Sequence, residues 1–146
     1  MTRTTIEIDG FAHENPVPAA CRIGPFVQSG VLTARDPRTG EIPADLDTQV
    51  ARVFDRVREV MAAAGGGVGG ILKLTLWVAD LRDREAINRE WVAMFPDAAD
   101  RPARQVMAAA LDRGCLVQAE LTAVIGEPDV LEVPDTIEQA PGGGIR

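Results

Sequence analysis

Residues 45–78 have the sequence DLDTQVARVFDRVREVMAAAGGGVGGILKLTLWV, and this stretch decides the fold class. From residue 46 to residue 64, apolar side chains recur three or four positions apart, which predicts a helix with one buried face. Asp45 is a suitable N-cap and Gly65 a suitable end for this helix. The apolar positions are Leu46, Val50, Val53, Phe54, Val57, Val60, Met61 and Ala64.

The opposite face of this predicted helix is polar, and we expect it to be exposed. It carries Asp47, Gln49, Arg52, Asp55, Arg56, Arg58 and Glu59. Residues 71–78 follow and predict a β-strand, because their side chains alternate in character. The apolar set that we expect to face the core consists of Leu72, Leu74, Leu76 and Val78, and Lys73 and Thr75 lie opposite.

The sequence patterns for the remaining helix and strands are weaker than those of this helix–strand unit. Residues 4–8 predict an edge strand, and residues 22–32 predict two short strands joined by a turn at Gly24-Pro25. A second helix is predicted at residues 83–94, followed by strands at 104–110 and 116–125 joined by the turn 112–114. The order β-β-α-β-α-β-β predicts a single α/β (α+β) domain over residues 1–126, with both helices on one face of the sheet. Residues 127–146 are rich in Pro, Gly and acidic residues and are predicted to form a tail.

Composition excludes several classes of function. The net charge of -7 and the absence of a Lys/Arg run argue against a nucleic-acid partner. No apolar run approaches the roughly 20 residues that span a bilayer, and the N-terminus does not resemble a signal peptide, so the cytoplasm is the expected location. One His and two Cys, Cys21 and Cys115, do not predict a metal site, and no cofactor is expected.

Two familiar patterns are rejected because the surrounding sequence does not support the function that each usually indicates. Residues 65–70 fit G-x-G-x-x-G, but they follow a helix and precede a strand, which is the reverse of a dinucleotide-binding loop. They therefore predict a helix–strand connection. Ser29 and Thr33 have only His13 as a possible base, so no Ser-His-Asp triad is expected.

Arg104 and Glu120 are the candidate functional side chains. Arg104 follows Pro102 at the start of a strand, and its planar guanidinium can bind a carboxylate at two points. Glu120 lies in a mostly apolar strand, on the same face as Gln118 and Thr122, where a half-buried carboxylate could act as a general base. A solvated surface arginine and an outward-facing polar row are the alternatives.

Several segments, in order and without large gaps from about Asn15 to Ile125, resemble the RidA/YjgF family. They are residues 26–30 (FVQSG), 36–43 (DPRTGEIP), 73–78 (KLTLWV), 87–91 (INREW), 94–96 (MFP), 101–104 (RPAR) and 116–120 (LVQAE). The resemblance implies a chorismate-mutase-like fold. It also implies a homotrimer whose sheets form a central barrel, with ligand clefts between subunits.

The same resemblance implies roles for individual residues. Arg104 would bind the substrate carboxylate, and Glu120 would position the attacking water. Ser29 and Gly30 would line the pocket, and Asn88 would stabilise the fold. Two positions depart from the family: Val17 aligns with a frequent Tyr, and Val106 replaces a frequent Cys. Residues 13–16 (HENP) are an alternative source of polar groups for the same cleft.

The expected function is hydrolysis of a small 2-imino acid, or its enamine tautomer, to a 2-oxo acid and ammonia without a cofactor. The partners expected are a small carboxylated substrate and further copies of the chain. Two alternatives stay open at this point. One is a pathway-specific deaminase or hydrolase of a larger carboxylated substrate, which an apolar Val17 favours. The other is a non-catalytic ligand-binding trimer.

Overall fold

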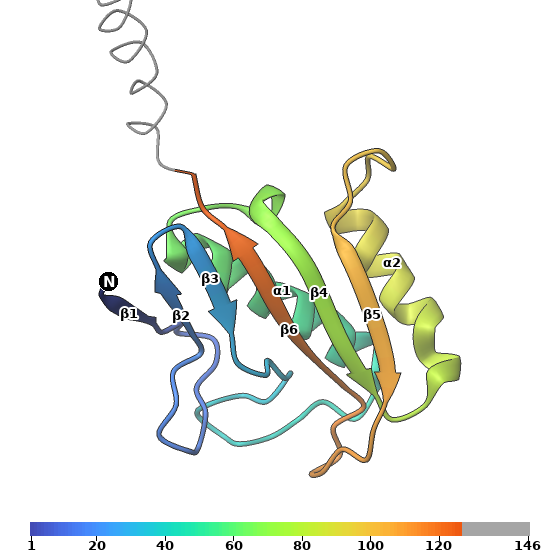
Figure 1. Ribbon diagram of the computed structural model, residues 1–146. Coiled ribbons are helices and arrows are strands. Elements are labelled where there is room, and N and C mark those ends of the chain that lie inside the picture. Colours follow the sequence, from blue (N-terminus) through green and yellow to red (C-terminus); the bar gives the residue numbers. More distant parts are fainter. Residues whose placement is uncertain (127–146) are drawn as a thin grey trace, which may run out of the picture.

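The computed structural model describes residues 1–126 and shows one mixed sheet with two helices packed on one of its faces (Figure 1). The predicted tail lies outside the described residues. The elements are β1 (Arg3–Ile6), β2 (Ala20–Ile23), β3 (Phe26–Ser29), α1 (Leu46–Ala64), β4 (Ile71–Val78), α2 (Arg84–Met94), β5 (Ala103–Ala108) and β6 (Val117–Val124). Two short 3-10 turns, Val68–Gly70 and Leu81–Asp83, precede β4 and α2. The predicted order is confirmed, with β1 as the edge strand that precedes it.

The six strands lie in the order β1-β2-β3-β6-β4-β5. Only β4 and β5 pair in parallel, and the other neighbours are antiparallel. The crossover through α2 therefore links two adjacent parallel strands, as a β-α-β unit does. As a consequence β5, which carries Arg104, forms one edge of the sheet with a single neighbour.

Helix α1 begins and ends where its sequence predicts. The Asp45 carboxylate accepts a hydrogen bond from the Thr48 backbone N–H at 2.9 Å, which satisfies a free donor of the first turn. At the other end Gly65 has a φ of 92°, a left-handed conformation that favours glycine, and its N–H donates to the Ala62 carbonyl. These two caps fix the length of the helix.

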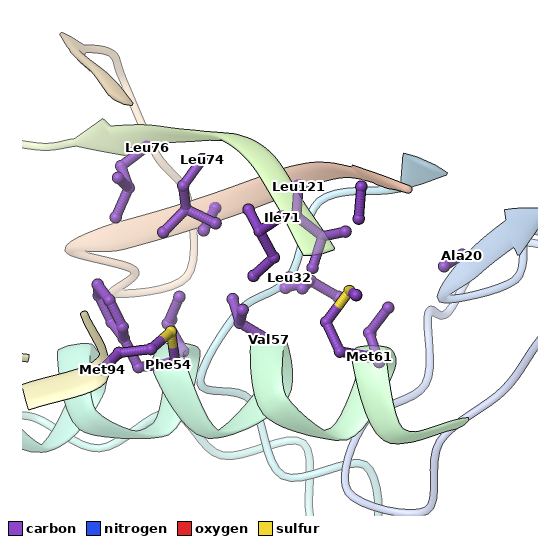
Figure 2. Packing of buried hydrophobic residues seen from close by; sticks show 14 of the residues in the cluster. Ala20, Leu32, Phe54, Val57, Met61, Ile71, Leu74, Leu76, Met94 and Leu121 are labelled. Carbon is purple, nitrogen blue, oxygen red and sulfur yellow. The ribbon is translucent and has the colours of Figure 1, made fainter. Parts of the chain in front are cut away.

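The core lies between α1 and the face of the sheet that the helices cover, which we call the helix face. Figure 2 shows Phe54, Val57 and Met61 of α1 directed towards Leu74 and Leu121 of the sheet. Each of these five side chains is at most 1% exposed. Burial of a side chain of this size stabilises the folded state by about 1.5–3 kcal/mol, so this layer holds the helix against the sheet.

The expected orientation of Leu72 is wrong. A register shift lies between Ile71 and Lys73 where β4 pairs with β6. The extra residue reverses the alternation at the start of the strand, so Ile71 is buried and Leu72 is 54% exposed. Leu74, Leu76 and Val78 face the core as predicted.

The glycine-rich stretch 65–70 connects α1 to β4, as predicted. Its last residue, Gly70, lies against β6: a Cβ at this position would come within 2.4 Å of the Val124 carbonyl oxygen. A larger residue there would have to displace backbone. This glycine therefore permits a close approach of two backbones and does not form a phosphate-binding loop.

Two residues assigned to the polar face of α1 are buried instead. Gln49 is fully buried and Arg56 is 9% exposed. Arg56 pairs with Glu59 at 3.0 Å. The Gln49 side chain donates to the carbonyls of Pro43 and Gly114 and accepts from the Leu116 N–H. It therefore ties the start of α1 to the loop before it and to the turn before β6, which a helical pattern alone does not reveal.

Replacing Gln49 with leucine is expected to lower the free energy of unfolding by about 3 kcal/mol, because three hydrogen bonds are lost and buried backbone groups stay unpaired. The measurement is denaturant unfolding followed by circular dichroism. Arg58→Leu, at an exposed position of the same helix, is the control and should change stability by less than about 0.5 kcal/mol. Equal effects of the two substitutions would contradict the assigned role.

Candidate functional site

Arg104 lies on the edge strand β5 and points to the helix face. It pairs with Leu74, whose side chain is in the core, and paired residues direct their side chains to the same face of a sheet. Its guanidinium carbon lies 5.0 Å from the centre of the Trp91 ring of α2. Burial, and secondarily the charge of Arg84, lower the pKa of Arg104 from its ordinary value, and an arginine still stays protonated at neutral pH.

Trp91 holds the Arg104 guanidinium in place. The indole is 8% exposed and contacts the Phe95 ring edge-on, with ring centres 4.8 Å apart. Within residues 1–126 no carboxylate forms an ion pair with Arg104. A positioned cation without an internal counter-ion is suited to bind an anionic ligand. The predicted helix at residues 83–94 contains Trp91, but the sequence pattern does not indicate this contact.

Glu120 faces the other side of the sheet, the side that neither helix covers, which we call the open face. It pairs with Thr75, and Thr75 also pairs with Gln105 of β5. Gln118 and Thr122 lie on the same face, and Val117, Ala119, Leu121 and Ala123 are buried opposite. The predicted alternation of β6 and the half-buried position of Glu120 are both confirmed.

Arg104 and Glu120 of one chain therefore do not meet. Leu74 pairs with both Arg104 and Leu121, which places these residues on the helix face, whereas Glu120 is one residue away on the open face. The sheet backbone separates the two charged groups. A site that contains both must take one of them from another copy of the chain.

Ser29 is 4% exposed, and its hydroxyl group is occupied by backbone partners. It donates to the Gly30 carbonyl at 2.7 Å and accepts from the Leu121 N–H at 2.9 Å. Ser29 thus extends the pairing of β3 and β6 beyond the last backbone pair. From β3 to β5 the sheet order crosses three strand spacings, about 14 Å, so Ser29 and Arg104 of one chain cannot contact the same small molecule.

The other expected site residues are Val106, Val17 and Gly30, and they lie in different parts of the fold. Val106 lies beside Arg104 on β5 and packs against the core. Val17 is 52% exposed, in the loop before β2. Gly30 follows β3, and its N–H donates to the Ala19 carbonyl. Asn88, which was expected to stabilise the fold, is exposed on α2, and its side chain forms no hydrogen bond with the described part of the chain.

Cys115 does not supply an activated nucleophile. Cys21 and Cys115 are both free thiols. Burial raises the pKa of the Cys115 thiol, which keeps it protonated at neutral pH.

Across residues 1–126 there is no cluster of three or more His, Cys, Asp or Glu side chains that could hold a metal ion. In the same residues no helix is long and apolar enough to cross a membrane.

The chain is similar in sequence to known proteins. A family model described as endoribonuclease L-PSP matches residues 6–125. The 2-iminobutanoate/2-iminopropanoate deaminase of Escherichia coli K12 is 38% identical over 125 residues, which cover 77% of this chain and 94% of that protein. The enzyme of the same name from Salmonella typhimurium is 37% identical over 124 residues, with the same two coverages.

Solved structures have the same fold. The YjgF gene product of E. coli superposes with a TM-score of 0.74 at 31% identity, over 83% of this chain and 98% of that one. E. coli TdcF with bound serine superposes with a TM-score of 0.76 at 28% identity, over 84% of this chain and 99% of that one. Two helices on a mixed sheet are therefore the common architecture.

Proposed function

The chain belongs to the YjgF/RidA family, and from this premise we propose that it hydrolyses small 2-imino acids, or their enamine tautomers, to 2-oxo acids and ammonia. The observation that carries the proposal is Arg104, held by Trp91 on an edge strand without a carboxylate partner in residues 1–126. The names of the relatives supply the reaction, and Arg104 supplies the group that a 2-imino acid needs for binding. TdcF, whose structure contains bound serine, also binds a carboxylated molecule.

In the proposed reaction Arg104 binds the substrate carboxylate with both arms of its guanidinium, which orients the adjacent imine carbon. Glu120 accepts a proton from water as the water oxygen bonds to that carbon, and it passes this proton to the imine nitrogen. Glu120, ionised again, then takes the proton of the new hydroxyl group and passes it to the amine nitrogen. The C–N bond breaks, and ammonia leaves as the carbonyl forms. The residues present suffice for this sequence of proton transfers.

We place each site between two subunits of a homotrimer. The opposite directions of Arg104 and Glu120 and the free edge of β5 support this arrangement. The open face also carries the half-buried apolar side chains Trp77 and Met107, which another sheet could cover. In this arrangement Arg104 and Val106 come from one subunit. Ser29, Gly30, Val17 and Glu120 come from the next, with the Ser29-Gly30 backbone as the wall of the pocket.

The name of the family model mentions an endoribonuclease, and we propose imine hydrolysis instead. A net charge of -7 opposes a polyanionic substrate, and the sequence contains no run of Lys and Arg interleaved with aromatic residues of the kind that binds RNA. The free thiols of Cys21 and Cys115 support a reducing compartment, and we propose the cytoplasm.

The test is the removal of 2-iminopropanoate, generated in situ by an oxidase acting on L-alanine. We expect the wild-type chain at catalytic concentration to accelerate the loss of the imine above its spontaneous hydrolysis, with equal amounts of pyruvate and ammonia formed. A heat-denatured sample is the control for non-specific catalysis. If the native and the denatured samples behave alike towards every 2-imino acid offered, the proposed function is wrong.

A further inference from the structure

A polar hollow of about 330 Å³ lies next to the proposed site. Its walls come from the N-terminal loop, from the segment that follows β3, and from the turn and first residues of β6. The wall includes His13, Thr33, Arg35 and Gln118, together with Glu14, Asp112, Arg113 and Cys115. We call it the side pocket. None of these residues has a role in the proposed hydrolysis.

The side pocket adjoins the proposed site at two points. Gln118 and Glu120 are two residues apart on the open face of β6, which corresponds to about 7 Å along a strand. At the second point the His13 ring lies over Gly30: a Cβ on Gly30 would come within 3.4 Å of His13 Nε2. A substrate whose reacting carbon lies near Glu120 could therefore extend its side chain into the side pocket.

The positive charge in the side pocket comes from Arg35. The wall carries two arginines, and Arg113 is paired with Glu14. Arg35 is half-buried, donates a hydrogen bond to the Ala12 carbonyl, and has no ion-pair partner in the described range 1–126. The remaining carboxylate, Asp112, is exposed, so solvent screens its charge more than that of Arg35.

His13 is a second polar group of this wall, and one of its ring nitrogens has no partner within residues 1–126. Its Nε2 is buried and has no hydrogen-bond partner among the described residues, and buried polar atoms in proteins nearly always have one. Its ring packs edge-on against Phe11, with ring centres 4.8 Å apart. Burial, and then the charge of Arg35, lower the pKa of His13, while Glu7 opposes them. The imidazole is therefore neutral at neutral pH and can still donate one hydrogen bond.

We propose that the side pocket binds the distal carboxylate of a 2-imino dicarboxylic acid, with Arg35 as its ionic partner and Thr33 and His13 as hydrogen-bonding groups. This inference rests on the proposed hydrolysis and names its substrate class. A five-carbon diacid, extended by one hydrogen bond, has a reach comparable to the roughly 7 Å between Glu120 and Gln118, the residue of this wall that lies on the same strand. The reaction that supplies such a substrate is the oxidation of an acidic amino acid to its imine.

The first experiment compares three imines with the same number of carbons, generated from L-glutamate, L-glutamine and L-norvaline. The wild-type chain should have the highest kcat/KM for the imine of L-glutamate. Arg35→Gln should lower that value roughly 10- to 100-fold, the worth of hydrogen bonds to a charged group, and change the value for the norvaline imine less than about twofold. Arg38→Gln is the matched control, because the Arg38 side chain is 90% exposed and lies outside the side pocket.

The outcomes separate this inference from the proposed function. If the chain hydrolyses 2-iminopropanoate but treats the three longer imines alike, the side-pocket assignment is wrong and the proposed function stands. An Arg35→Gln variant that slows all three equally also overturns the assignment. If no imine is hydrolysed faster than in buffer, the proposed function fails first.

The second experiment does not depend on catalysis. His13 is the only histidine of the chain, so one NMR resonance of the untagged protein reports its pKa. Saturating 2-oxoglutarate should raise that pKa, because a carboxylate favours the charged imidazolium and offsets the charge of Arg35. The monocarboxylate 2-oxopentanoate should not raise it, and neither compound should do so in Arg35→Gln. Equal responses to the two oxo acids in the wild type would overturn the assignment.

Discussion

Replacing Arg104 with alanine is expected to lower kcat/KM for 2-iminopropanoate at least about 100-fold. Charge-assisted hydrogen bonds contribute about 1.5–3 kcal/mol each, and a guanidinium binds a carboxylate with two of them. Because each 1.36 kcal/mol corresponds to a tenfold change in rate, the loss of even one such bond approaches the lower bound. Most of the change should appear in KM, with a smaller part in kcat from the lost orientation of the imine carbon.

Two further variants make this result specific. Arg104→Lys keeps the charge but not the planar fork, so its kcat/KM should lie between those of the wild type and the alanine variant. Arg58→Ala removes an equal charge from an exposed position of α1, where Arg58 pairs with Asp55, and should have wild-type kinetics. The free energy of unfolding of Arg104→Ala should differ from that of the wild type by only about 1 kcal/mol, which is the contribution of the contact with Trp91.

A wild-type kcat/KM in Arg104→Ala would exclude the carboxylate-binding role. If the chain still hydrolysed 2-iminopropanoate, another cation would have to bind the carboxylate. The half-buried Arg35 of the side pocket would then be the first candidate. The same kinetic series applied to Arg35→Gln distinguishes these two arrangements.

The helices and strands were predicted well from local sequence patterns, because the interactions that form them are also local. The apolar spacing of α1, the Asp45 cap and the left-handed Gly65 all act within one turn of the helix, and each is found where expected. Leu72 was placed wrongly because a bulge depends on the pairing of β4 with β6, which the sequence of β4 alone does not contain. Gln49 was placed wrongly for a related reason: its partners Gly114 and Leu116 lie far away in the sequence.

The candidate site could be predicted only in part from the sequence. The alternation of β6 gave the correct face for Glu120, because alternation is a property of one strand. The face of Arg104 depends on the register between β4 and β5, and its contact with Trp91 depends on where α2 crosses β5. The sequence therefore indicated the two charged residues but not that the sheet separates them. That separation is the structural reason why we propose a site shared between subunits.

The second large effect is expected from mixing two inactive variants. In Arg104→Ala each subunit keeps Glu120, and in Glu120→Gln each subunit keeps Arg104. If a site takes Arg104 from one subunit and Glu120 from the next, mixed trimers contain interfaces at which both residues are intact. Random exchange of equal amounts should restore about one quarter of the wild-type activity, because half of the subunits can supply each residue to an interface.

The measurement is 2-iminopropanoate hydrolysis after the two variants are unfolded together and refolded, compared with each variant refolded alone. A mixture no more active than the separate variants would mean that both residues act within one subunit. The sheet register then makes the proposed pairing of Arg104 with Glu120 untenable, because the two side chains of one chain lie on opposite faces. Restored activity, in contrast, requires an interface at which the edge strand β5 of one subunit meets the open face of another. Complementation therefore tests the catalytic pair and the shared site in a single experiment.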